Sequence, residues 1–447
     1  MAGDYMALAD EFAAQISTGV LKAGERLPPQ RQFAWTRNIA VSTASRVYSE
    51  LLRRGLVVGE VGRGTFVSGD TKSGGLAATG EPRGSRIDLE FNFPILPAQF
   101  SLMAKSLEGL DRGDALQSSL QQSTSVGTAR VRQVASQFLA AGGWSPRPGQ
   151  LVFTGNGRQS IAAVLAALVP TGGRCGVEAI TYPFAKGVAA RLGITLVPIA
   201  MDEQGMRPDA VQKANREGRL SAIYVQPVIH NPLGMTMPRQ RRTDLLRMAG
   251  KLDLVVVEDF IYGFLDDEPP LATEAPDRCI VIDSLSKRIA PGLSLGFIAA
   301  PQHLRENIIA SVRTGGWIAQ GVAFAAAERL MSDGTAAEIT RLKREDAKAR
   351  QLLAVDLLSG LQVQTNPKSY HLWLSLPEQW RSQTFVAAAA RHDIALTPSS
   401  AFAVNSGHAP NAVRLALAQP SHDQLREALA TLAHVLKGSE AESHFTE

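Results

Sequence analysis

The first 69 positions carry apolar residues at helical spacing, followed by a short alternating stretch. Leu8, Phe12 and Ile16 recur every four residues and therefore share one helix face. Gly19 ends that helix, and Pro28 and Pro29 open the next. The pattern predicts three helices and a two-stranded hairpin: Tyr5–Ser17, a short helix through Arg31 and Trp35, Thr43–Arg54 with Ser42 as N-cap, and the strands Leu56–Val58 and Thr65–Val67.

From about residue 87 the pattern changes to apolar strands that alternate with helix-like stretches. This alternation predicts an α/β domain with a mostly parallel sheet covered by helices, its strands including Leu151–Phe153, Ser221–Val225, Leu254–Val257 and Cys279–Ile282. After about residue 335, a charged helix and short strands predict a smaller α+β subdomain. Residues 70–86 hold four glycines and few large apolar side chains, which is typical of a flexible linker. We therefore expect domains at 1–69 and 87–447, the latter with a small subdomain at 335–447.

Composition narrows the class of protein. The 447 residues are 45% hydrophobic and 20% charged, which is typical of soluble globular proteins with two or three domains. No apolar run is long enough for a membrane span, and the N-terminus lacks a signal-peptide pattern. Cys175 and Cys279 alone give neither a disulfide framework nor a thiolate metal site. We expect a cytoplasmic protein without a metal.

Basic residues are concentrated in the N-terminal segment. Residues 20–69 hold eight Lys or Arg against three acidic residues, although the whole chain has a net charge of only +4. Three helices and a hairpin are the layout of a winged helix-turn-helix, whose third helix enters the DNA major groove. Ser42, Thr43, Ser45 and Arg46 would then face base edges. Arg31 and Arg63 would contact phosphates. The alternative is an ordinary packing domain with a solvated basic face.

Several short stretches resemble the DNA-binding domain of the GntR superfamily. They are Gly24–Arg31, Val41–Val47, Leu51–Leu56 and Gly62–Val67, and together they cover nearly all of residues 10–69. The resemblance implies binding to double-stranded operator DNA.

The larger region carries residues suited to an aldehyde cofactor. Lys287 follows an apolar strand and two serines, and Asp259 ends another apolar run. Thr154–Gln159 is a glycine-rich turn between a strand and a helix, a layout that can hold phosphate. Each feature alone also has a structural explanation: an exposed lysine, a helix cap or a simple turn.

Taken in order, residues 87–437 resemble fold-type-I aminotransferases, which use pyridoxal 5′-phosphate. The resemblance implies that Lys287 forms the Schiff base and that Asp259 pairs with the pyridine nitrogen. It implies Asn231 and Tyr262 at the ring 3-oxygen and Tyr182 stacked on the ring. Arg414 would bind a substrate or effector carboxylate. The phosphate would be held by Gly157, Arg158, Gln159, Ser284 and Ser286.

The sequence also departs from that family. Ser294 follows Pro291–Leu293, where the family has an arginine that grips the phosphate. Gln122 stands where a tyrosine from the partner subunit is usual. Ser369 and Tyr370 replace a glycine pair, and Leu233 replaces a threonine. Weaker cofactor binding is expected unless Arg288 or Arg158 supplies the missing charge, since one charge-assisted bond is worth roughly 1.5–3 kcal/mol.

A winged helix joined to an aminotransferase-like domain resembles the MocR-type regulators of the GntR superfamily. The resemblance implies a transcription regulator that forms a head-to-tail homodimer. Its large domain would sense pyridoxal phosphate, an amine or an amino acid through Lys287. Two alternatives remain at this stage: an active aminotransferase with an accessory DNA-binding domain, and a sensor that has lost the cofactor.

Overall fold

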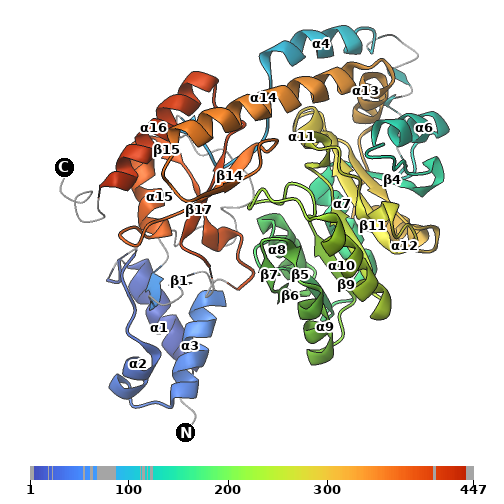
Figure 1. The fold of residues 1–447 in the computed structure, drawn as a ribbon. Coiled ribbons are helices and arrows are strands. Elements are labelled where there is room, and N and C mark those ends of the chain that lie inside the picture. The colour runs from blue at the N-terminus through green and yellow to red at the C-terminus, as the bar shows by residue number, and fades with distance from the viewer. Residues whose placement is uncertain are drawn as a thin grey trace.

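The structure is a computed structural model, and its parts are arranged as a small N-terminal unit beside a larger two-lobed body (Figure 1). It describes residues 5–18, 20–22, 24–53, 56–60, 64–67, 87–110, 112, 116–117, 119–120, 124–405 and 409–438. The predicted linker 70–86, the wing residue Arg63 and Gln122 lie outside these described residues.

The N-terminal unit consists of three helices and a hairpin: α1 (Tyr5–Ser17), α2 (Gln30–Thr36), α3 (Val41–Arg53), β1 (Val57–Glu60) and β2 (Gly64–Val67). The two strands pair antiparallel, as the sequence predicted. Phe12, Phe33 and Tyr48 form its aromatic centre, with ring centroids 5.2–6.4 Å apart. Ser42 lies within the first turn of α3, because the helix begins one residue before the predicted cap.

A seven-stranded mixed sheet forms the centre of the larger body, in the order β4-β12-β11-β10-β9-β5-β6. Every neighbouring pair is parallel except the two that β12 makes, so the predicted mostly parallel sheet is confirmed. The strands are almost entirely buried apart from β6, which explains their continuous apolar runs. They are β4 (Leu151–Thr154), β5 (Arg174–Glu178), β6 (Thr195–Ile199), β9 (Ala222–Val225), β10 (Val255–Asp259), β11 (Cys279–Ser284) and β12 (Gly296–Ala299).

Helices cover this sheet on both faces (Figure 1). They are α6 (Ala129–Phe138), α7 (Gly157–Leu168), α8 (Pro183–Arg191), α9 (Pro208–Glu217), α10 (Arg239–Lys251), α12 (Gln302–Thr314) and α13 (Gly321–Ser332), with the one-turn α11 (Leu285–Arg288) directly after β11. Helix α4 (Pro97–Leu107) packs against α13. Smaller elements are β7 (Met201–Asp202), β8 (Gly205–Met206), η1 (Pro148–Gln150), η2 (Gly263–Leu265) and η3 (Leu271–Thr273).

The second lobe is a four-stranded sheet with helices. The long α14 (Thr335–Leu357) runs from the first lobe into it (Figure 1). The strands β13 (Val363–Thr365), β14 (His371–Ser375), β17 (Ala412–Ala416) and β16 (Thr397–Pro398) are antiparallel neighbours in that order. The remaining elements are α15 (Ser382–Arg391), β15 (Ile394–Ala395), η4 (Ser399–Ala401) and α16 (His422–Lys437).

The segment that follows the predicted linker joins the second lobe at once. Strand β3 (Ile87–Asp88) pairs in parallel with β15. The N-terminal unit touches the same lobe, because the Arg381 guanidinium lies 4.0 Å over the Phe66 ring and donates to the Gly24 carbonyl at 3.3 Å. The chain therefore enters the larger body on the same lobe that contacts the N-terminal unit.

Candidate functional sites

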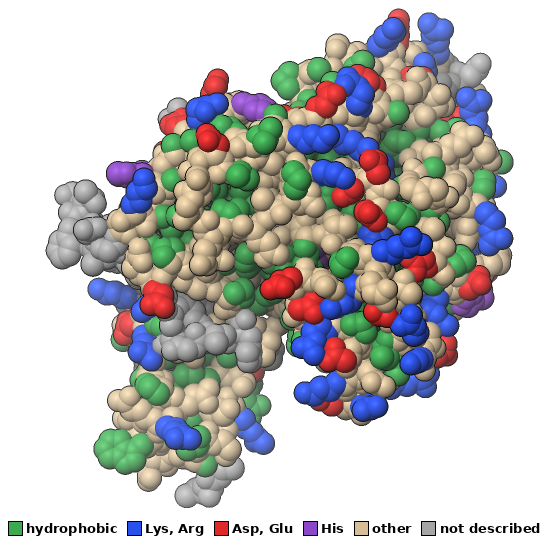
Figure 2. Space-filling view, viewed as in Figure 1, with side chains coloured by type: hydrophobic (Ala, Val, Ile, Leu, Met, Phe, Trp, Pro, Cys, Tyr) green, Lys and Arg blue, Asp and Glu red, His purple; other side chains and the backbone are tan. Residues whose placement is uncertain are grey.

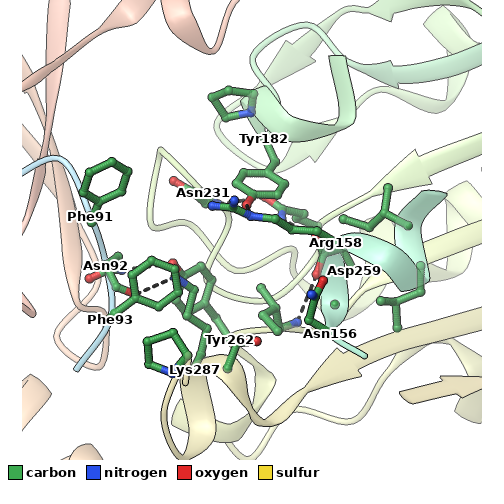
Figure 3. Close-up of a pocket in the computed structure, with 18 of the residues that line it drawn as sticks. Phe91, Asn92, Phe93, Asn156, Arg158, Tyr182, Asn231, Asp259, Tyr262 and Lys287 are labelled. Carbon is green, nitrogen blue, oxygen red and sulfur yellow. Dashed lines mark hydrogen bonds between the residues drawn. The ribbon is translucent and has the colours of Figure 1, made fainter. Parts of the chain in front are cut away.

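One cavity collects most of the predicted cofactor residues (Figure 3). Asp259 comes from the end of β10, Lys287 from α11 and Arg414 from β17, so both lobes contribute. Gln159, Ser284 and Arg288 do not line the cavity, although the structure describes all three. The lining residues predicted from the sequence are Gly157, Arg158, Tyr182, Asn231, Asp259, Tyr262, Ser286, Lys287 and Arg414.

The Lys287 amine is buried against a segment that the sequence did not suggest. Its Nζ donates to the Asn92 carbonyl at 2.6 Å and lies 3.4 Å from the centroid of the Phe93 ring. Burial lowers the pKa of Lys287 well below its usual value, and the positive charges of Arg158 and Arg414 lower it further. The amine is therefore neutral more readily than an ordinary lysine, as a nucleophile must be.

Asp259 is held from a neighbouring strand. Its Oδ2 accepts from the Tyr224 hydroxyl at 2.5 Å and from Gln226 Nε2 at 2.9 Å, and its Oδ1 accepts from the Ile261 amide at 3.2 Å. Burial raises the pKa of Asp259, whereas the bonds from Tyr224 and Gln226 lower it and favour the carboxylate. Sequence reasoning missed Tyr224 and Gln226. Gln226 had a signal, because it is a polar residue directly after an apolar run.

Arg414 and Tyr262 both form hydrogen bonds with the segment that follows β3. Arg414 donates to Asn231 Oδ1 at 3.2 Å, to Thr397 Oγ1 at 3.2 Å and to the Glu90 carbonyl. The Tyr262 hydroxyl accepts from Asn92 Nδ2 at 3.0 Å. Asn231 and Arg414, 183 residues apart, thus form one polar pair that can receive a carboxylate.

The turn after β4 forms a cradle at the start of α7. Asn156 caps the helix by accepting from the Gln159 amide at 3.0 Å. A Cβ added to Gly157 would lie 3.1 Å from Ser284 Cβ, a tight contact that glycine avoids. Ser284 Oγ lies 2.9 Å from Ser286 Oγ and 3.2 Å from Ser294 Oγ, and Ser286 also bonds Ser294. Hydroxyls and backbone amides at a helix N-terminus suit a phosphate.

The two arginines proposed to supply charge differ in position. Arg158 lines the cavity and donates to the Tyr182 hydroxyl at 3.3 Å (Figure 3). Arg288 bonds the buried Asp283 carboxylate twice, at 2.9 and 2.6 Å, and packs against Phe138 and Phe264. Of these two arginines, only Arg158 is therefore placed to reach a ligand in the cavity.

The donor set fits pyridoxal phosphate. A buried lysine with a lowered pKa for the aldehyde, a carboxylate for the ring nitrogen and a hydroxyl-rich helix N-terminus for the phosphate meet in one cavity. Arg158 adds a positive charge beside Tyr182. No group of three or more potential metal ligands occurs within the described residues.

The predicted DNA-facing residues that the structure describes lie on α2 and α3. Arg31, Ser42 and Arg46 are exposed, whereas Thr43 and Ser45 are partly buried. Two exposed apolar residues were not predicted as part of this surface: Trp35, with 85% of its surface exposed, and Val41, with 52%. Figure 2 shows a hollow between the N-terminal unit and the lobe that carries α9 and α10. On the face shown, Lys and Arg gather on that lobe.

Comparison with known families decides the class of the larger body. The family model for class I and II aminotransferases matches residues 110–432. The chain belongs to this aminotransferase family. The model for bacterial regulatory proteins of the gntR family matches residues 4–67, so a winged helix-turn-helix of that family precedes the aminotransferase domain.

Two curated relatives are named as transcriptional regulators. An uncharacterized HTH-type transcriptional regulator of Bacillus subtilis, YdeF, is 28% identical over 97% of this chain and 94% of its own. The HTH-type pyridoxine biosynthesis transcriptional regulator PdxR of Corynebacterium glutamicum is 25% identical over 68% of each chain.

Solved structures support the fold of the aminotransferase domain. An archaeal alanine:glyoxylate aminotransferase superposes with a TM-score of 0.72 at 21% identity, over 88% of this chain and 94% of its own. The α-aminoadipate aminotransferase LysN of Thermus thermophilus superposes with a TM-score of 0.70 at 24% identity, over 79% of this chain and 92% of its own. The cofactor of this fold is pyridoxal 5′-phosphate, and the chain is a pyridoxal phosphate-binding, DNA-binding transcription regulator. No helix within the described residues is long and apolar enough to cross a membrane.

Proposed function

We propose that the aminotransferase domain of this regulator serves as a chemical sensor that controls DNA binding. The observation that carries the proposal is the buried Lys287 amine, which shares one cavity with Asp259 and Arg414 in a chain that begins with a DNA-binding domain. The ligand sensed is pyridoxal phosphate itself, or an amine or amino acid that reacts with it.

Each cavity residue has one task in this proposal. Pyridoxal phosphate, when bound, supplies an aldehyde that condenses with a primary amine and a ring that withdraws electrons. Lys287 provides the amine that holds it, and Asp259 holds a proton at the ring nitrogen. Tyr262 and Asn231 donate to the ring 3-oxygen, and Tyr182 stacks on the ring.

The phosphate is held at the start of α7. The amides of Gly157 and Arg158 would donate to it, whereas the Gln159 amide already bonds Asn156, and Ser286, backed by Ser284, would supply hydroxyl groups. Arg158 leaves the Tyr182 hydroxyl to pair with the phosphate, which replaces the charge that Ser294 does not carry. Arg288 instead positions the strand end through Asp283. Arg414 and Asn231 receive the carboxylate of an amino acid.

On the DNA side, α3 enters the major groove. Ser42, Thr43, Ser45 and Arg46 face base edges there, and Arg31 and Arg63 contact phosphates. We place the DNA-binding domain at 1–69, the linker at 70–86 and the sensor domain at 87–447, with the small subdomain at 335–447. Two chains associate head to tail in the cytoplasm, since a dimer presents two α3 helices to two half-sites.

Coupling requires that the ligand bind two arrangements of the chain with different affinity. The contact of Arg381 with Phe66 joins the N-terminal unit to the lobe that also carries Arg414. Closure of that lobe on a ligand carboxylate would therefore move the surface on which the N-terminal unit rests.

Two measurements test this function. The purified chain should gain visible absorbance from lysine-bound cofactor when pyridoxal phosphate is added. Arg46→Ala should weaken binding to a duplex selected from a random pool without changing that absorbance, whereas Arg219→Ala, on the exposed surface of the sensor domain, should change neither. Wild-type DNA affinity in Arg46→Ala would contradict the assignment of α3. Rapid turnover of amino acids into keto acids would instead support an enzyme.

A further inference from the structure

Aromatic side chains surround the part of the cavity next to Arg414. Phe91 and Phe93 line it from the segment after β3, and both are partly buried. Phe402 lines it from the turn after η4 and is 1% exposed. Its ring centroid lies 5.1 Å from the Arg414 guanidinium carbon and 6.0 Å from the Trp373 ring. Arg414 therefore has aromatic side chains beside it in addition to its polar partners Asn231 and Thr397.

The charged side chains that line the cavity limit which charged groups a ligand can have. Among the described residues that line it, the basic side chains are those of Arg158, Lys287 and Arg414. In the proposed function Lys287 meets the cofactor aldehyde and Arg158 meets the phosphate. Arg414 then remains for the ligand, and it can pair with one carboxylate.

An acidic residue stands beside that one remaining cation. Glu90 lines the cavity, and its backbone carbonyl accepts from Arg414. Burial lowers the pKa of Arg414, while Tyr262 and the negative charge of Glu90 act in the opposite direction. A second carboxylate on a ligand would lie near the acidic Glu90 and would have no cation to pair with. Burying such an unpaired charge is unfavourable.

We propose that the ligand of this site is an amino acid with a single carboxylate and an apolar or aromatic side chain, and that dicarboxylic amino acids are excluded. The proposal rests on the proposed function, because it assigns Lys287 and Arg158 to the cofactor. Phe91, Phe93 and Phe402 would cover the side chain of the ligand, and Glu90 would repel a second acid group.

A ligand series on the wild-type chain tests this directly. The full chain, loaded with pyridoxal phosphate, is titrated with L-phenylalanine, L-leucine, L-alanine and L-glutamate, and the visible absorbance of the bound cofactor is followed. Phenylalanine and leucine should bind about tenfold or more tightly than alanine, since each buried apolar group adds to the affinity. Glutamate should bind more weakly than alanine. Glutamate as the tightest ligand would overturn the proposal. No absorbance change with any amino acid would instead contradict the sensing of amino acids.

Three variants locate the effect. Phe91→Ala should lose about tenfold in affinity for phenylalanine and leave that for alanine nearly unchanged. Phe100→Ala, the same substitution at a 65% exposed position of α4, serves as the matched control and should match the wild type. Glu90→Gln should narrow the gap between alanine and glutamate. An unchanged preference in both cavity variants would overturn the assignment of these residues.

Discussion

The Lys287 amine donates to the backbone carbonyl of Asn92, 2.6 Å away. Two residues earlier, the Glu90 carbonyl accepts from Arg414. The backbone of one short segment thus accepts hydrogen bonds from both side chains that would bind an amino acid and its aldehyde cofactor. A ligand must replace these carbonyls, and the same segment continues into β3 at the point where the chain enters the larger body. This places ligand capture close to the connection with the DNA-binding domain.

Replacing Lys287 by alanine should abolish the visible absorbance of the lysine-bound cofactor while the fold remains intact. No other lysine lines the cavity within the described residues. Absorbance spectroscopy with pyridoxal phosphate checks the first point, and circular dichroism checks the second. Lys105→Ala, at an exposed position of α4, is the control and should keep the band. If the band persists in Lys287→Ala, another amine holds the cofactor.

Arg158 and Arg288 should respond differently to substitution. Arg158→Ala should weaken cofactor binding about 10- to 100-fold with little change in thermal stability, because a charge-assisted bond is worth roughly 1.5–3 kcal/mol. Arg288→Ala should mainly destabilise the fold, by about 3–5 kcal/mol, because it leaves the buried Asp283 carboxylate unpaired. Cofactor titration and thermal melting separate the two effects. The reverse pattern would show that Arg288 is the phosphate ligand.

Glu258 should make stability depend on pH. It is fully buried, and burial raises its pKa from 4.5 to about 8. The folded state then holds one more proton than the unfolded state between these values. The stabilisation from this proton is complete below pH 4.5 and is lost as the pH rises through about 8. Relative to Glu258→Gln, the free energy of unfolding of the wild type should fall on the order of 1 kcal/mol per pH unit between about pH 5 and about pH 8.

Denaturant unfolding at several pH values measures this difference. Glu306→Gln, at an exposed position, is the control and should follow the wild type. Parallel pH profiles for the wild type and Glu258→Gln would contradict the shifted ionisation.

Arg381→Ala should loosen the contact between the N-terminal unit and α15. A cation–π contact is worth about 0.5–2 kcal/mol, and the bond to the Gly24 carbonyl is lost as well. Backbone amides of β2 should then exchange hydrogen faster. Arg391→Ala, at the other end of α15, should leave their exchange unchanged. Equal exchange in both variants would mean that Arg381 does not hold the unit in place.

The sequence predicted those parts of the molecule that depend on local pattern. The three N-terminal helices, the hairpin and the main strands follow from apolar spacing. Asp259 ends one buried strand, and Lys287 lies in the turn of helix that follows another. Contacts between residues that are far apart in the sequence leave no such local pattern. Asn92 meets Lys287 across 195 residues, and Tyr224 reaches Asp259 from the neighbouring strand.

The pattern of apolar residues also did not predict the direction in which side chains point. Arg288 and Lys287 are adjacent in sequence, yet the single turn of α11 directs them to different surroundings, so only Lys287 lines the cavity. The start of α3 differed by two residues, because the helix begins at Val41 instead of Thr43 and Ser42 falls in its first turn.

The most direct test of the central claim is the DNA affinity of the full chain with and without the ligands of its cavity. Fluorescence anisotropy with a duplex selected from a random pool gives the Kd alone, with pyridoxal phosphate, and with pyridoxal phosphate plus L-phenylalanine. The account predicts a change in Kd of about fivefold or more in at least one of these steps, and its loss in Lys287→Ala. An identical Kd under all three conditions, or the same change in Lys287→Ala, would contradict it.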